Sequence, residues 1–340
     1  MKIEVFGLKF RTRRTYVQMI SLVVLFALNG VSCTSTDPTA EVNPTIPTES
    51  PSRTLVVPKP TITQEPAEAT ATEIIETRIE FDGQRAFELV ERQLEFGYRI
   101  PGSDGHRMAG DWILEQLQAS GWNTEEQIFA YQNLQGRNII AKAGPEGGEW
   151  VILGAHYDTR PIADRDESNP AEPVLGANDG ASGVAVLLEL ARVIQPEDLD
   201  RALWLVFFDL EDSGGIDGKE WIVGSNYFAE HLEDKPSQVI IVDMVGDADL
   251  QLYFELNSNV ELRTEIWQLA EELGFTSFIP ESKHSIVDDH TSFLRRGIPA
   301  IDIIDFDYPY WHTTEDTLDK VSASSLEQVG QTLEVWLLRD

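Results

Sequence analysis

The sequence predicts an α/β fold, a three-layer sandwich in which helices flank a central twisted sheet of mixed but mostly parallel strands. Helical and extended patterns alternate along the second half of the chain, as they do in proteins with parallel sheets. The segment 150–155 is a continuous apolar run, which indicates a central strand buried on both faces.

Two helices open the predicted domain, which begins near Glu76. In the first helix, apolar side chains recur at helical spacing at Phe87, Val90 and Leu94. The second helix runs over residues 106–120 and ends at Gly121, a residue that commonly terminates helices. We expect His106, at the start of this helix, to be exposed and without a functional role.

Six segments of strand length follow these helices. They are residues 126–131, 138–143, 150–155, 202–208, 238–242 and 298–304. Between the third and fourth, a helical stripe is formed by Val184, Leu187, Leu188 and Ala191. The last helix is predicted to be capped at Ser324, where Glu327 completes a capping box. Among the tryptophans, we expect Trp204 in the core.

The charge balance restricts the partners that the protein can bind. The chain of 340 residues has 58 acidic against 26 basic residues, a formal net charge of -32. A nucleic-acid-binding protein needs a basic face, so no nucleic acid is expected as a partner. Acidic side chains also keep a protein soluble, so charge alone locates no site. The length suits one large domain, residues 76–340, expected as a monomer.

The first 33 residues have the layout of an export signal. Basic residues at 9–14 precede a mostly apolar stretch at 16–28, which is too short to cross a membrane comfortably. Small residues then lead to Cys33, the only cysteine of the chain. This arrangement resembles a bacterial lipoprotein signal, in which the cysteine is lipidated, although Gly30 stands where that pattern usually has Leu. A conventional cleaved signal and an uncleaved anchor remain open.

Residues 34–75 are rich in Thr and Pro and hold few large apolar side chains. Such a composition cannot offset the entropy of ordering, so it predicts a disordered tether. Together with the signal at 1–33, it predicts an exported protein of the cell envelope, held at a membrane by an N-terminal lipid and facing away from the cytoplasm.

Acidic and imidazole side chains lie after the predicted strands, at the ends where open α/β sheets place their functional crevice. They are His156, Asp158, Glu211, Asp212 and Asp243, with His312 after a short loop that follows 298–304 and Asp179 between the strands. Imidazole and carboxylate together suit Zn²⁺, and a catalytic zinc ion keeps three protein ligands with one position open. The set is large enough for one or two metal ions.

Five strings resemble, in order and approximate spacing, those of the zinc aminopeptidase superfamily that also contains glutaminyl-peptide cyclotransferases. They are GAHYDTRP, GANDGASGVAVLLELAR, FFDLED, VDMVGD and YWHTTEDTLDKV. The resemblance covers roughly Phe87 to the C-terminus, and the agreement of five separated motifs makes it specific. It implies a zinc exopeptidase-like fold and an enzyme that acts on the N-termini of peptides or proteins.

The resemblance also implies roles for the strand-end residues. Cyclases hold one zinc ion at the positions of Asp179, Asp212 and His312. Aminopeptidases hold a second zinc ion at the positions of His156 and Asp243, with Asp179 bridging. The position of Glu211 is the general base, and that of Asp158 orients His156. Asp212 stands where the family usually has Glu.

Several features are more similar to the cyclases than to the aminopeptidases. The run DDHTSFLRRGIP at 288–299 resembles a cyclase string, whereas aminopeptidases more often have Ser in place of Asp288. The resemblance implies that Asp288 and Asp243 hold the proton relay and the leaving amide. It also implies that Trp311 and Tyr308 pack the substrate side chain. Asp302 departs from the pattern, because those cyclases have a histidine there.

Three hypotheses follow for the function. The first is a glutaminyl-peptide cyclotransferase with one zinc ion, which converts N-terminal Gln to pyroglutamate and releases ammonia. The second is an aminopeptidase with two zinc ions. The third is a non-catalytic binding lipoprotein on the same fold. The complete metal set with its adjacent base favours the two enzymes.

Overall fold

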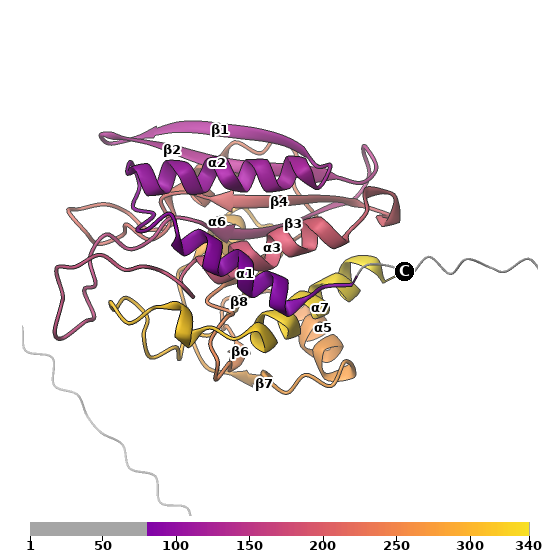
Figure 1. Ribbon diagram of the computed structural model, residues 1–340. Coiled ribbons are helices and arrows are strands. Elements are labelled where there is room, and N and C mark those ends of the chain that lie inside the picture. Colours follow the sequence, from indigo (N-terminus) through magenta and orange to yellow (C-terminus); the bar gives the residue numbers. More distant parts are fainter. Residues whose placement is uncertain (1–79, 340) are drawn as a thin grey trace, which may run out of the picture. The chain divides into compact units, whose positions relative to one another are not determined.

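The computed structural model of the chain describes residues 80–339 (Figure 1). The signal and lipidation predicted for residues 1–33 and the tether predicted for 34–75 lie outside the described residues. Within the described residues, none of the helices is long and apolar enough to span a membrane.

The described part alternates helices and strands as predicted. The helices are α1 (Gly83–Leu94), α2 (Asp104–Ala119), α3 (Ala181–Val193), α4 (Val223–Glu230), α5 (Val260–Glu272), α6 (Asp289–Leu294) and α7 (Ala323–Leu338). The strands are β1 (Asn123–Tyr131), β2 (Leu134–Ala143), β3 (Trp150–His156), β4 (Ala202–Phe208), β5 (Gln238–Asp243), β6 (Leu252–Phe254), β7 (Phe278–Ser282) and β8 (Ala300–Ile304).

The main sheet has the strand order β1-β2-β4-β3-β5-β8 among the described residues. Strands β4, β3, β5 and β8 are parallel, whereas β2 pairs antiparallel with β4 and β1 pairs antiparallel with β2. Figure 1 shows α1, α2 and α3 across one face of the sheet and α6 on the other. A separate buried apolar cluster fills each interface. The predicted three-layer fold with a mixed, mostly parallel sheet is therefore confirmed, and the carboxyl ends of four strands meet at one edge.

The first hairpin differs from the prediction, which began its two strands later. Tyr131 pairs with Leu134, so the connection is only Gln132 and Asn133. Gln132 has a φ of 51°, a conformation that residues other than glycine rarely adopt. The turn lacks the glycine that usually indicates a two-residue hairpin. The sequence pattern therefore did not predict that the two strands pair up to Tyr131 and Leu134.

Two further predictions were wrong. The cap of α7 is Ser322, whose side chain accepts a hydrogen bond from the backbone of Ser324. Ser324 therefore lies within the first turn, and Glu327 instead accepts from the side chain of Gln331. Trp204 is half-buried rather than in the core, because α4 covers only part of the second face of the sheet.

Candidate metal centre

The predicted site residues converge at the carboxyl edge of the parallel strands. His156 and Asp243 are the last residues of β3 and β5, and Glu211 and Asp212 follow β4. Asp179 precedes α3, and His312 lies in the loop after β8. All six residues are buried. The strand ends and the loops beside them thus bring together side chains that are up to 156 positions apart in the sequence, from His156 to His312.

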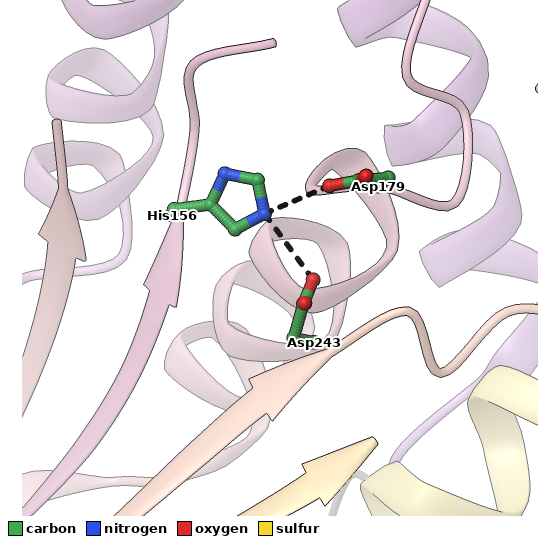
Figure 2. Close-up of side chains that lie close together, drawn as sticks. All are labelled: His156, Asp179 and Asp243. Atoms are coloured by element: carbon green, nitrogen blue, oxygen red, sulfur yellow. Dashed lines mark hydrogen bonds and ion pairs between the residues drawn. The ribbon is translucent and has the colours of Figure 1, made fainter. Parts of the chain in front are cut away.

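The first group of possible ligands is formed by His156, Asp179 and Asp243 (Figure 2). The Nε2 atom of His156 lies 3.1 Å from Oδ1 of Asp179 and 3.2 Å from Oδ1 of Asp243. Figure 2 shows both carboxylates turned toward the same ring nitrogen. One imidazole nitrogen and two carboxylates therefore face a common point.

The second group is formed by Asp179, Asp212 and His312. The Nε2 atom of His312 lies 3.1 Å from Oδ1 of Asp212 and 3.8 Å from Oδ2 of Asp179. Asp179 thus directs one oxygen toward His156 and the other toward His312. This is the arrangement that a bridging carboxylate requires.

The residues of both groups fit a zinc ion. Among the described residues, Oδ2 of Asp179 and Oδ2 of Asp212 are buried and accept no hydrogen bond. Burial, reinforced by the charge of Asp179, raises the pKa of Asp212 to about 6. Burial also raises the pKa of Asp243. A bound cation would relieve this excess of carboxylate charge, and the donor set of imidazole and carboxylate suits zinc.

A second carboxylate faces the other ring nitrogen of each histidine. Oδ1 of Asp158 lies 3.6 Å from Nδ1 of His156, and Asp158 also accepts hydrogen bonds from the backbone of Glu211 and Asp212. Oδ1 of Asp164 lies 3.2 Å from Nδ1 of His312. Such partners fix the orientation of metal-binding histidines. Asp158 was predicted from the sequence, whereas Asp164 was not.

Arg160, which the sequence analysis missed, organises the second group. Its guanidinium donates two hydrogen bonds of 2.9 Å to Asp164 and one of 3.1 Å to the backbone carbonyl of Asp212. It therefore links the carboxylate that holds His312 to the loop that carries Asp212. The available signal was its place two residues after Asp158, in the same loop after β3.

Asp316 is a second residue that the sequence analysis missed. Its carboxylate accepts hydrogen bonds from the backbone N–H groups of Asn178 (2.8 Å) and Asp179 (3.1 Å) and from the hydroxyl of Tyr308 (2.8 Å). Tyr308 is buried among Met244 and other apolar side chains. Its part in packing a substrate stays a prediction, while its hydroxyl supports Asp316.

Glu211 and Asp288 lie beside the two groups. Burial raises the pKa of Glu211 well above its usual value, and the charge of Asp288 adds to the effect. Burial together with the charge of Asp243 raises the pKa of Asp288 to about 7. Glu211 and Asp288 are 8% and 4% exposed, so both keep a small opening to solvent. Trp311 packs on His312, with ring centroids 4.2 Å apart.

The backbone is strained where it presents these side chains. Leu210, Met244 and His312 have φ values of 57°, 45° and 57°. Leu210 precedes Glu211, and Met244 follows Asp243, so all three lie in the loops of the metal centre. Non-glycine residues in this region cluster at functional sites.

The prediction for His106 was wrong. His106 is buried, and its Nε2 atom lies 2.8 Å from Oδ1 of Asp209. Its ring also stacks on Tyr157, with centroids 4.9 Å apart. The prediction failed because the polar residues around His106 in the sequence form the cap of α2, which turns His106 toward β4.

Comparison with known families supports this geometry. Residues 138–337 match peptidase family M28, a range that spans more than half of the chain and contains every predicted metal ligand. The chain belongs to peptidase family M28. The superfamily named by the five sequence strings is thereby confirmed.

The relatives of this M28 chain include proteins named for each of the two predicted activities. A glutaminyl-peptide cyclotransferase of Drosophila melanogaster is 27% identical over 277 residues, which cover 71% of this chain and 76% of the relative. The structure of a glutaminyl cyclase of Bacteroides thetaiotaomicron, bound to N-acetylhistamine, is 33% identical with a TM-score of 0.73, covering 78% of this chain and 100% of that one. A leucine aminopeptidase precursor of the same species is also 33% identical with a TM-score of 0.73, covering 78% and 99%.

Proposed function

We propose that this M28 chain is a zinc-dependent glutaminyl-peptide cyclotransferase that converts N-terminal Gln of peptides or proteins to pyroglutamate. The reaction joins the α-amino nitrogen to the γ-carbonyl carbon of Gln and releases ammonia. The observation that carries the proposal is the place of Asp288, a buried carboxyl near Glu211 and Asp243. Burial, with the charge of Asp288 added, raises the pKa of the predicted base Glu211, and burial together with the charge of Asp243 raises the pKa of Asp288. Aminopeptidases more often have Ser at that position.

The side chains divide the reaction between them. Glu211 takes a proton from the α-amine and later delivers one to the departing ammonia, which requires a pKa near the working pH. Asp243 and Asp288 hold the leaving amide and the proton relay. A zinc ion bound by Asp179, Asp212 and His312 supplies Lewis-acid polarisation of the γ-carbonyl. Trp311, which packs on His312, lines the pocket for the small Gln side chain.

A zinc aminopeptidase is the second candidate, and the shared position of Asp179 favours it. Asp179 faces both His156 and His312, which is the geometry for two bridged ions. Under this proposal Glu211 would pass a proton from the attacking water to the leaving amine. The two candidates thus differ in metal count as well as in substrate, with one zinc ion for the cyclase and two for the aminopeptidase.

The test is a turnover assay on the zinc-loaded chain with paired peptides that carry N-terminal Gln or Leu. Ammonia and a pyroglutamyl product from the Gln peptide, with the Leu peptide unchanged, would support the cyclase. Release of free Leu would instead support the aminopeptidase. Turnover of neither peptide by chain that has bound zinc would overturn both. Asp288→Asn sharpens the test, because it should lower cyclisation more strongly than any Leu release.

We further propose that the chain is exported and held at a membrane of the cell envelope through lipid on Cys33. The support is the signal-like layout of residues 1–33 followed by a Thr/Pro-rich stretch. Expression of the full chain with Cys33→Ala tests this. Release of the variant from the membrane fraction is expected, whereas equal membrane association of both forms would overturn lipid anchoring.

A further inference from the structure

A third buried group of the same composition lies beside the metal centre. Asp288, His290 and Asp302 each offer one ligand atom, and these atoms lie within 4.8 Å of one another. Asp288 caps α6, His290 lies in the first turn of α6, and Asp302 is the central residue of β8. The three residues are 4%, 0% and 1% exposed. Nothing in the proposed reaction uses His290 or Asp302.

Most polar atoms of this group lack a hydrogen-bond partner within residues 80–339. Both carboxylate oxygens of Asp302 and both ring nitrogens of His290 are buried without one. Such groups normally find a partner in native proteins, because an unsatisfied buried polar atom costs about 1–3 kcal/mol. The atoms are directed at one another, with Nδ1 of His290 at 3.5 Å from Oδ2 of Asp302.

This spacing agrees with the two groups around Asp179. There, the distances from imidazole nitrogen to carboxylate oxygen are 3.1 and 3.2 Å at His156 and 3.1 and 3.8 Å at His312. Ligand atoms held at about 2.0–2.2 Å from a tetrahedral ion are about 3.3–3.6 Å apart. The pair formed by His290 and Asp302 therefore has the separation of two ligands of one ion.

The three histidines also share a second feature. Each has a further carboxylate at the ring nitrogen that does not face its ligand group, as metal-binding histidines commonly do. The pairs are His156 with Asp158 (3.6 Å), His312 with Asp164 (3.2 Å) and His290 with Glu255 (3.3 Å).

Glu255 is held in place by several hydrogen bonds. Its Oε1 atom accepts one of 3.0 Å from the backbone of Ile286 and one of 2.9 Å from the side-chain amide of Asn257. Glu255 also accepts hydrogen bonds from the backbone and hydroxyl of Ser258. Glu255 therefore faces Nε2 of His290 from a fixed position, and Nδ1 is the ring nitrogen that faces Asp302.

The charge around His290 is strongly unbalanced. Asp288, Asp302 and Glu255 place three buried carboxyl groups around one imidazole. Buried charge of one sign requires either bound protons or a cation. A divalent cation would neutralise two carboxylates at once and would give the unpartnered atoms of His290 and Asp302 a partner.

We propose that Asp288, His290 and Asp302 bind an additional divalent cation of the zinc type, separate from any ion held around Asp179. This site does not depend on whether the enzyme cyclises or hydrolyses its substrate. Asp288 is shared with the proton relay of the proposed cyclase, so an ion bound at the additional site would compete with that role.

The first test compares the zinc content of the full chain and two variants after loading with excess Zn²⁺ and desalting. Asp302→Asn removes a ligand at constant shape and should lose one equivalent of zinc per chain. Asp289→Asn removes the same charge from an adjacent buried position outside the ligand group and should keep the content of the unmodified chain. Equal zinc content in the unmodified chain and folded Asp302→Asn would overturn the proposal.

A second measurement needs no variant. Crystals of the chain grown with Zn²⁺ should give an anomalous difference peak at the zinc absorption edge between Asp288, His290 and Asp302. Occupied sites around Asp179 without this peak would overturn the additional site. Because neither measurement uses turnover, failure of the proposed cyclase activity would leave both results interpretable.

Discussion

At the carboxyl ends of β3, β4 and β5 the acidic side chains are buried, whereas at the amino ends of β3 and β4 they are exposed. The amino ends border a groove of about 1160 Å³ whose lining includes Trp150, Trp204 and Lys142. Its acidic residues, such as Glu146, Glu149 and Glu233, are exposed to solvent. The carboxyl ends instead hold Glu211 and its neighbours, which are less than one-tenth exposed.

The difference shows that burial, and not the sign of the charge, marks the functional edge of this acidic protein. A solvated carboxylate is screened and costs little. A buried carboxylate must share protons or bind a cation, and it can therefore act as a base or a ligand. The following predictions test this contrast between the two ends, beginning with the largest expected effect.

Loss of the buried base should nearly abolish activity. Glu211→Gln keeps the size of the side chain but cannot accept a proton, so kcat/KM should fall by about 10²–10⁴-fold for whichever substrate is turned over. The matched control is Glu125→Gln in the groove, where the side chain is 56% exposed. Equal losses in both variants would contradict the contrast between the two ends.

Removing support from Asp179 should weaken metal binding more than it affects folding. Asp316→Asn eliminates one of the carboxylate oxygens that accept from the backbone of Asn178 and Asp179. We expect zinc affinity to fall by about 10–100-fold, as for other residues that orient metal ligands. Competition with a chromophoric chelator measures this. Tyr308→Phe removes only the hydroxyl contact to Asp316 and should have a smaller effect, and unchanged affinity in Asp316→Asn would refute the positioning role.

The metal-free protein should become less stable as pH rises from 5 to 8. Burial raises the pKa values of Asp288, Asp305 and Asp316 to about 7, so the folded state binds protons there that the unfolded state has already released. The free energy of unfolding therefore decreases through this range. His106 contributes with the same sign, because burial opposes protonation but Asp209 outweighs it and raises its pKa.

Thermal unfolding in the presence of a chelator measures this effect. The Tm should fall between pH 5 and pH 8, and saturating Zn²⁺ should reduce the fall, because a cation takes the place of the protons. A Tm that rises over this range in the metal-free protein would show that the buried carboxyls carry no extra protons.

The sequence alone predicted the central strands of the fold and the site residues that lie directly at the ends of those strands. Continuous apolar runs identified β3, β4 and β5, and the rule that parallel strands share a carboxyl edge placed His156, Glu211 and Asp243 together. Asp179 and His312 were also candidates, but their roles as zinc ligands came from the resemblance, because neither directly ends a predicted strand. Their convergence depends on loops, which local periodicity does not describe.

The contacts that orient the ligands could not be predicted, because they join backbone and side chains across long sequence distances. Asp316 accepts a hydrogen bond from the backbone N–H of Asp179, which is 137 positions away in the sequence. His106 reaches Asp209 over 103 positions. When a polar residue has polar neighbours in the sequence, it is predicted to be exposed. The sequence does not indicate that a distant carboxylate or backbone amide forms a hydrogen bond with its buried side chain.

The smallest effect is expected at the exposed end. The ammonium of Lys142 lies 3.8 Å from the ring centroid of Trp204 and 2.8 Å from Oε2 of Glu125, whose side chain is largely solvated. Lys142→Met keeps most of the aliphatic stem and should destabilise the protein by about 0.5–1 kcal/mol, measured by urea unfolding, without changing kcat/KM. A loss of activity comparable with that of Glu211→Gln would mean that the groove communicates with the metal centre. Unchanged activity would confine the function to the edge where carboxylates are buried.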